Sequence, residues 1–351
     1  MRQTLKFTIL LLLTGLLLWW FARGVEWGQV RGELDRANLW LIACGVAAVC
    51  VTYFLRALRW RALLAPLTPA SLKALTAATT VGFGSVFLIG RAGEVVRPAF
   101  LPLADSRVRP AASFVTIGVE RLYDIVAVVV LFAVNLIWFR APGGDPAAYA
   151  QVRRAGFVML AAAIVGVGVL VWLRGHAPAL IVWLDRKFER GPRPLKRAGG
   201  LLTHVLEQLR GALGVLTDAR GLAVTTGLTA LLWAVIVLAN FCVLRAFGLP
   251  FGPAETIFVL GWALVGSLVP TPGGAAGAFH VATARGLSFL GVAAAKATAV
   301  SIILHLVVFG PAVFLGLYFF LRSDVKLSGL RQTDAAREPA GGPTPSNLER
   351  V

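Results

Sequence analysis

Residues 297–321 read ATAVSIILHLVVFGPAVFLGLYFFL, and no Asp, Glu, Lys or Arg interrupts this run of 25 residues. A helix needs about 20 apolar residues to cross the ~30 Å hydrocarbon core of a bilayer, so this run is long enough. Further charge-free runs lie at 37–55, 155–173, 221–244 and 256–284. The sequence therefore predicts an all-α, polytopic helical membrane protein.

The composition agrees with this prediction. Hydrophobic residues make up 58% of the 351 residues, against about 45–50% in soluble domains. The alternating short strands of a membrane barrel are absent from the sequence. The formal charge is +17, and the basic residues lie between apolar runs, where they orient spans and meet anionic lipids. No nucleic-acid-binding motif accompanies the charge, so we expect no nucleic-acid partner.

Charge counting gives the expected topology. Full spans are expected at about 5–22, 38–56, 119–139, 155–173, 221–245 and 297–321. The loops 56–73 and 174–220 are rich in Lys and Arg and should face the cytoplasm, as should both termini. We expect a multi-pass protein of the cell inner membrane. Its domain covers 1–321, including the loop 174–220 with an amphipathic helix, and a disordered cytoplasmic tail covers 322–351.

Two polar, helix-breaking signatures interrupt the apolar sequence. Residues 90–98 read GRAGEVVRP, and residues 269–277 read VPTPGGAAG. Glycine and proline at this density do not extend a helix. The segment 256–269 before the second signature is short for a span and typical of a re-entrant half-helix.

We expect the two broken elements to enter from opposite faces, with six to ten crossings in all, as in transporters whose broken helices build a site. One alternative is that both elements are ordinary loops between complete helices. Another is that the first element makes two full crossings in place of a re-entrant pair.

The first signature carries three ionisable side chains, Arg91, Glu94 and Arg97, spaced three apart. On one helical face Glu94 would pair with either arginine. The arginine left over would suit a phosphate, because guanidinium offers a planar fork of donors. The alternative is an interfacial loop whose arginines meet lipid phosphates.

A second charged group, Glu120, Arg121 and Asp124, opens the run that continues to Phe139. Glu120 and Asp124 share a helix face at i, i+4 spacing. Carboxylates at a helix N-terminus gain from the macrodipole, which is the simple explanation. The functional alternative is a link from these carboxylates to Arg91 or Arg97.

The second signature supplies Gly273 and Gly274, whose exposed amides would attract an anion at a half-helix N-terminus. His280 follows closely, while His305 interrupts the last apolar run and is expected to be a packing residue. No His or Cys has metal-ligand spacing, and no nucleotide-binding motif occurs. We expect no metal, no cofactor and no catalytic residue.

Three motifs in this order resemble a known family. The stretches RAGEVVR at 91–97, ERLYD at 120–124 and PTPGG at 270–274 are similar to those of the lysylphosphatidylglycerol synthase transmembrane region, or flippase-like domain family. The resemblance implies an inner-membrane domain related to those that translocate aminoacylated phospholipids. Related domains also accompany glycosyltransferases acting on polyprenyl-linked sugars. We expect the chain to lack the aminoacyl-transferring domain that the resemblance would otherwise imply. It also has Phe279-His280 where many relatives have a glutamate.

These observations favour a protein that moves or binds a polar-headgroup lipid and is a transporter rather than an enzyme. The headgroup site would be formed by Arg91, Glu94, Arg97, Glu120, Arg121, Asp124, Gly273, Gly274 and His280. The lipid would be a phospholipid, an aminoacyl-phospholipid or a polyprenyl-linked lipid, with a separate synthase or glycosyltransferase as a possible partner. The alternatives are a membrane accessory subunit or transferase acting on lipid-linked sugars, and a small-solute secondary transporter.

Overall fold

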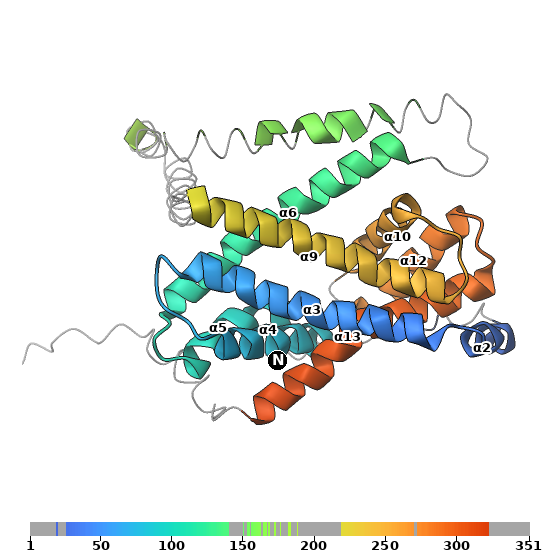
Figure 1. Ribbon diagram of the computed structural model, residues 1–351, viewed down its shortest axis with the longest axis horizontal. Helices are drawn as coiled ribbons and strands as arrows, with labels where there is room; N and C mark the ends of the chain where they lie inside the picture. Colours follow the sequence, from blue (N-terminus) through green and yellow to red (C-terminus); the bar gives the residue numbers. More distant parts are fainter. Residues whose placement is uncertain are drawn as a thin grey trace, which may run out of the picture.

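The computed structural model describes residues 26–139, 219–269 and 272–322, with isolated residues at 19 and between 150 and 188. Every regular element in these ranges is helical (Figure 1), which confirms the all-α prediction. Four described helices are long and apolar enough to cross a membrane: α3 (Leu39–Leu64), α4 (Leu72–Ile89), α9 (Ala219–Ala246) and α13 (Ala294–Leu321).

Several sequence predictions fall outside the described residues. These are the spans 5–22 and 155–173, of which only single residues or short stretches are described, the amphipathic helix of the loop 174–220 and the tail beyond Arg322. The range of six to ten crossings therefore stays a prediction.

The long helices α3 and α9 form an antiparallel pair along the long axis of the molecule (Figure 1). The Asn38 amide donates to the Ala246 carbonyl at 2.8 Å, so the start of α3 meets the end of α9. Between these ends the backbones approach closely, because a methyl group at Gly45 would lie 3.3 Å from the Ala239 carbonyl oxygen. The short helix α2 (Trp27–Asp35) precedes α3, and α6 (Pro110–Trp138) crosses the pair.

The first signature forms the tip of a helical hairpin. Helix α4 ends at Ile89, the 3-10 helix η1 (Gly90–Val95) turns the chain, and α5 (Val96–Ala104) returns along α4. Glycines allow this close return: a methyl group at Gly82 would overlap Arg97 Cβ, and one at Gly93 would overlap the backbone of Ser85. The returning arm has only nine residues, so it is too short to span a bilayer by itself.

The second signature forms the tip of another hairpin, made by α10 (Pro253–Gly266), α11 (Pro272–Ala275) and α12 (Ala278–Phe289). Three consecutive residues at the turn, Gly273 to Ala275, have φ of 74°, 63° and 61°, in the left-handed region. Glycine adopts this region without steric penalty. The arms pack tightly, since a methyl group at Gly266 would overlap the Ala278 carbonyl.

The two hairpins enter from opposite ends of the bundle and meet at their tips. Hairpin α4–α5 lies toward one end in Figure 1, and hairpin α10–α12 lies at the other. Between them η1 contacts α11, and α11 also contacts α4. The prediction of two broken helical elements is therefore confirmed, and both are hairpins with one or two short arms.

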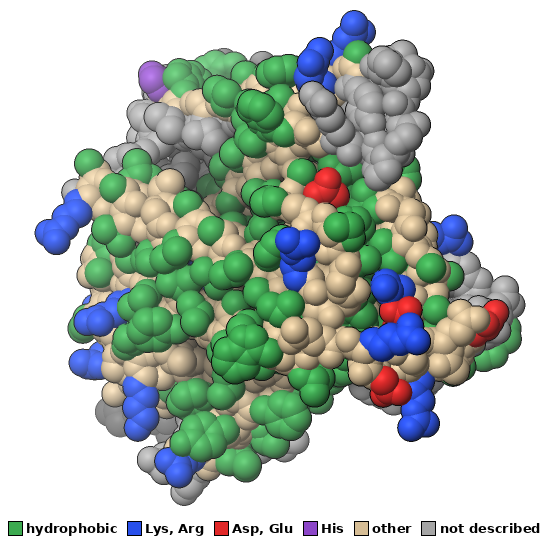
Figure 2. Space-filling model, turned by 45° about the vertical axis from the view of Figure 1, so that its right-hand side comes forward, with side chains coloured by type: hydrophobic (Ala, Val, Ile, Leu, Met, Phe, Trp, Pro, Cys, Tyr) green, Lys and Arg blue, Asp and Glu red, His purple; other side chains and the backbone are tan. Residues whose placement is uncertain are grey.

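The surface fits a hydrocarbon environment. Figure 2 shows hydrophobic side chains over much of one face, with basic side chains mainly toward its edges. Large apolar side chains are widely exposed, among them Trp40 at 75%, Trp138 at 76% and Phe314 at 76%. Exposed apolar surface on this scale is costly in water and favourable against lipid tails.

Small residues set the crossing of α4 and α13. A methyl group at Gly84 would lie 2.9 Å from the Ala312 carbonyl oxygen, and one at Gly316 would lie 2.7 Å from the Thr80 carbonyl oxygen. Helices in membranes associate through such close approaches, because apolar burial alone gives them no advantage over lipid.

We expect Gly316→Ala to lower the melting temperature of the detergent-solubilised protein. The added methyl group meets backbone, which costs about 1–3 kcal/mol in a packed core. Gly310→Ala on the same helix is the matched control, because nothing lies within 4 Å of its added methyl group. Equal melting temperatures for the two variants would contradict this account of the crossing.

A polar clamp joins the loops at one end of the bundle. Asp105 accepts hydrogen bonds from the Ser71 amide at 2.9 Å and from Arg107 Nη2 at 2.8 Å. Thr68 donates to the Arg107 carbonyl at 2.7 Å. The hydrogen bonds from Arg107 and Ser71 hold the pKa of the Asp105 carboxyl well below its ordinary value.

Because the pKa of Asp105 is lowered in the folded state, its stabilising effect is present above the unfolded pKa and is lost as the pH falls through the folded pKa. We therefore expect the stability difference between the wild type and Asp105→Asn to be full above about pH 5 and to shrink below about pH 4. Thermal unfolding in detergent from pH 6 to pH 3 measures it. A pH-independent difference would show that the charge of Asp105 does not stabilise the fold.

Candidate functional site

The two charged groups of the sequence meet in one buried ion pair. Arg97, on the first turn of α5, donates through Nη1 to Glu120 Oε1 at 2.6 Å and through Nη2 to Oε2 at 3.1 Å. The Arg97 side chain is 3% exposed and the Glu120 side chain is 0% exposed. Two parallel bonds of this kind are the strongest geometry between a guanidinium and a carboxylate.

A third side chain, Arg59 of α3, joins both carboxylates of α6. Its Nη2 lies 3.1 Å from Glu120 Oε1, and its Nη1 donates to Asp124 Oδ1 at 2.8 Å. The same Nη1 lies 3.1 Å from the hydroxyl of Thr229 on α9. Arg59 is fully buried. Together these side chains form an ionic cluster that connects α3, η1, α5 and α6. Its members are Arg56, Arg59, Glu94, Arg97, Glu120, Arg121 and Asp124.

Aromatic rings hold two arginines of the cluster. The Arg97 guanidinium lies 4.4 Å from the centre of the buried Trp60 ring, whose Nε1 donates to Thr116 at 2.9 Å. The Arg56 guanidinium lies 4.9 Å from the centre of the Phe83 ring and 3.6 Å from Asp124. Each ring attracts the positive charge above its face and fixes the direction of the guanidinium.

The cluster has a buried floor and an open rim. At the rim Arg121 Nε lies 3.8 Å from Glu94 Oε2, and Arg121 Nη1 lies 3.9 Å from Asp124 Oδ2. The side chains of Arg121 and Glu94 are 39% and 41% exposed, against 3% or less for the floor residues Arg59, Arg97 and Glu120. Arg121 is therefore the arginine held most loosely.

The cluster carries an excess of positive charge. It holds four arginines and three carboxylates, so its formal charge is one unit positive. Within the part of the chain that the structure describes, the buried Nε atoms of Arg59 and Arg97 have no hydrogen-bond acceptor. A buried donor without an acceptor is unfavourable, and an anion would satisfy it.

Two sequence interpretations of this region were wrong. Glu120 and Asp124 do not cap a helix, because α6 begins at Pro110 and places both well inside it. Arg56 and Arg59 do not lie in a loop, because α3 continues to Leu64. Sequence reasoning counted these two arginines only as topogenic charge and missed that they are partly or fully buried. The signal available was their position on the helical continuation of the span 38–56.

The predicted pairing inside the first signature also differs from the structure. Glu94 lies opposite Arg121, while Arg97 forms an ion pair with Glu120. The turn at η1 separates Glu94 from Arg97, so the two do not share one regular helical face. The backbone of Arg91 lies in η1, and its side chain falls outside the described residues.

The residues of the second signature lie at a separate place. The rings of His280 and His305 are 4.7 Å apart, and His305 Nε2 lies 3.2 Å from the Gly274 carbonyl oxygen. Gly274 packs on Phe309, where an added methyl group would lie 2.9 Å from the ring. Gly273, Gly274 and His280 form none of the ion pairs of the cluster, and α11, which carries the two glycines, contacts both η1 and α4.

Residues 6–316 match the family described as the lysylphosphatidylglycerol synthase TM region. The chain belongs to this family. The match covers both hairpins and the whole ionic cluster, and it confirms the resemblance seen in the three motifs. Membership supports a membrane protein related to lipids.

One curated relative is the glycosyltransferase AglD of Haloferax volcanii, which is 28% identical over 93% of this chain and 56% of its own length. The chain thus spans about half the length of that relative. The expectation that the chain is not an enzyme is contradicted by this match, because the relative bears the name of an enzyme. No solved structure matches the chain.

We expect Glu120→Gln to lower folding stability by about 3–5 kcal/mol, since it leaves Arg59 and Arg97 buried without their shared counter-charge. The matched control is Glu33→Gln, which breaks a partly exposed pair with Lys296 Nζ at 3.3 Å. That change should cost about 0–1 kcal/mol. Thermal unfolding of both purified variants measures the loss of folding stability. Equal losses would show that the buried ion pair contributes no more to stability than the partly exposed one.

Proposed function

We propose that this chain binds the phosphate-bearing headgroup of a membrane lipid at the ionic cluster and translocates that lipid between leaflets. The lipid is a phospholipid, an aminoacyl-phospholipid or a polyprenyl-linked lipid, which share a phosphate. The observation that carries the proposal is the excess positive charge of the cluster together with its unused buried donors, the Nε atoms of Arg59 and Arg97. Arginine is the side chain best suited to a phosphate, because its donors match two oxygens at once.

The rim gives the headgroup its first contact. Arg121 is held at 3.8 and 3.9 Å by two carboxylates, distances at which no direct hydrogen bond forms. A phosphate can therefore form an ion pair with Arg121 without breaking a strong hydrogen bond. Once it enters, the floor arginines Arg59 and Arg97 face it with fixed charge in a site that excludes water, where such interactions are stronger than in solution.

The hairpins supply a route for translocation. A polar headgroup does not cross ~30 Å of hydrocarbon unsolvated, and fixed polar groups replace its water. The tips η1 and α11 meet between the two ends of the bundle, and η1 carries Glu94 into the cluster. Broken helices that meet inside a bundle form the central sites of many transporters. The acyl chains would stay in the lipid beside the exposed apolar face (Figure 2).

A second candidate is a transferase, or the membrane subunit of one, that acts on a lipid-linked sugar. The match to the glycosyltransferase AglD favours it. The same cluster would then hold the lipid phosphate while the sugar is transferred. Because the chain spans 56% of that relative, the group that binds a sugar donor is not assigned to any residue of this chain.

Reconstituted vesicles test translocation. Purified protein in liposomes with fluorescent phospholipids and aminoacylated phospholipids should expose inner-leaflet label to an external quencher faster than protein-free liposomes do. We expect the double variant Arg97→Gln/Glu120→Gln to lose most of this activity, because it removes the charges while keeping hydrogen-bonding groups. The same double variant should be more stable than Glu120→Gln alone, since it leaves one buried arginine fewer unpaired.

The Glu33→Gln variant serves as the control and should translocate lipid at the wild-type rate. A wild-type rate no higher than that of empty vesicles, for every headgroup, would overturn translocation. The second candidate has its own readout. Radiolabelled lipid product formed by the purified protein from a polyprenyl-phosphate and a labelled sugar donor would favour the transferase.

A further inference from the structure

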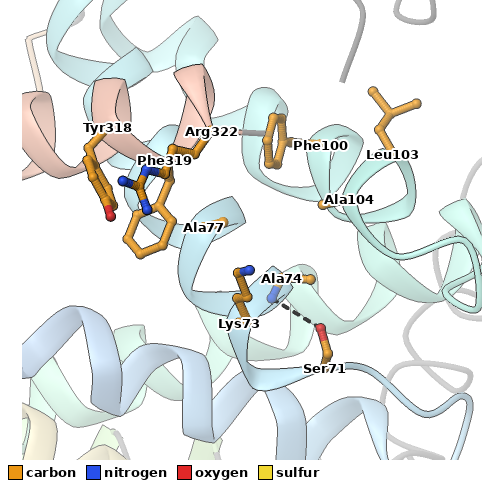
Figure 3. Close-up of a pocket in the computed structure, with 10 residues that line it drawn as sticks. All are labelled: Ser71, Lys73, Ala74, Ala77, Phe100, Leu103, Ala104, Tyr318, Phe319 and Arg322. Carbon is orange, nitrogen blue, oxygen red and sulfur yellow. Dashed lines mark hydrogen bonds between the residues drawn. The ribbon is translucent and has the colours of Figure 1, made fainter. Parts of the chain in front are cut away.

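A cavity of about 370 Å³ lies away from the ionic cluster, at the end of the bundle where α4 begins and where α5 and α13 end. Figure 3 shows its walls coming from these three helices. Its lining residues are Ser71, Lys73, Ala74, Ala77, Phe100, Leu103, Ala104, Tyr318, Phe319 and Arg322. None of them belongs to the ionic cluster or to the second signature.

The antiparallel packing of α4 and α13 creates this cavity. Thr80 meets Gly316 one or two turns further into the bundle, so Lys73 near the start of α4 and Arg322 just after α13 reach the same end. Both helices qualify as membrane spans by length and composition. The cavity therefore lies where two apolar spans stop, at the depth at which lipid phosphates sit.

The charge in the cavity has one sign. Among the described lining residues, Lys73 and Arg322 are the only ionisable ones apart from the Tyr318 phenol, and none is a carboxylate. Among the residues that the structure describes, neither cation forms an ion pair with a carboxylate. The nearby Asp105 accepts from the Ser71 amide, and Arg107 at 2.8 Å already neutralises it.

The remaining wall is apolar and aromatic. Phe100, Leu103 and Phe319 line it, and the Arg322 guanidinium lies 4.9 Å from the centre of the Tyr318 ring, which fixes its position. Figure 3 shows Arg322 beside Tyr318 and Phe319, Lys73 below them, and Phe100 and Leu103 to their right. A soluble anion needs only the cations. A molecule with an anionic head and an apolar tail uses both walls at once.

We propose that this cavity binds one anionic phospholipid, with its phosphate between Lys73 and Arg322 and its upper acyl chain against Phe100 and Phe319. This lipid is separate from the translocated one and holds the start of α4 to the end of α13. The proposal does not rest on the proposed function, since the two sites share no residue.

The test measures how much an added lipid raises the melting temperature of the full chain in mixed micelles. Phosphatidylglycerol should raise it more than phosphatidylcholine at equal mole fraction. We expect Lys73→Gln/Arg322→Gln to weaken the apparent affinity for phosphatidylglycerol roughly thirtyfold, since each basic residue near an anionic lipid contributes a factor of about five. The swap Lys73→Arg/Arg322→Lys keeps both charges and should keep the effect.

Two further variants separate a built site from general surface charge. Arg61→Gln/Arg109→Gln removes the same charge from exposed side chains outside the cavity, and it should keep the wild-type response. Ala104→Trp fills the exposed mouth of the cavity while both cations remain, and it should abolish the preference for phosphatidylglycerol.

Three results would overturn the proposal. One is a wild-type protein that responds equally to phosphatidylglycerol and phosphatidylcholine. Another is an equal loss in the cavity double variant and the surface double variant. The third is a stabilisation by inorganic phosphate or glycerol phosphate that matches the stabilisation by lipid, because it would assign the cavity to a soluble anion.

Discussion

The structure depends on a carboxylate, Glu120, that is fully buried between two arginines. A single charge at this depth would be highly unfavourable, and each of its oxygens therefore receives a guanidinium. The pair with Arg97 fixes the returning arm of the first hairpin, and the contact with Arg59 fixes α3. Since apolar packing distinguishes poorly between helix and lipid, these ionic contacts define which helices meet and in what register.

The same interaction explains why the first hairpin is short. Arg97 lies on the first turn of α5, directly after the η1 turn, and its side chain must reach α6. Gly82 has no side chain, and this leaves room for Arg97 Cβ to pack directly against the α4 backbone. A longer connection would carry Arg97 away from Glu120, so the turn residues and the ion pair constrain each other.

Much of the fold could be predicted from the sequence, because charge-free runs and clustered glycines report directly on spans and breaks. The link between Arg97 and Glu120 was among the predicted alternatives. The cluster was incomplete in the prediction because Arg56 and Arg59 follow the apolar run and look like ordinary flanking charge. Only the packing of α3 against α6 distinguishes them. His280 and His305, predicted separately, come together because α12 packs on α13, a contact that no local pattern encodes.

The antiparallel pairing of α4 and α13 has a consequence for biosynthesis. Gly316 packs against the backbone of Thr80, so the chain must be synthesised through Gly316 before α4 gains α13 as a neighbour. Until then the small-residue face of α4 lies against lipid, and the groove that α13 will occupy stays without a neighbouring helix. Assembly of the described bundle is thus completed only after α13 has left the ribosome, and a chain stopped before α13 would leave this face of α4 without its neighbouring helix.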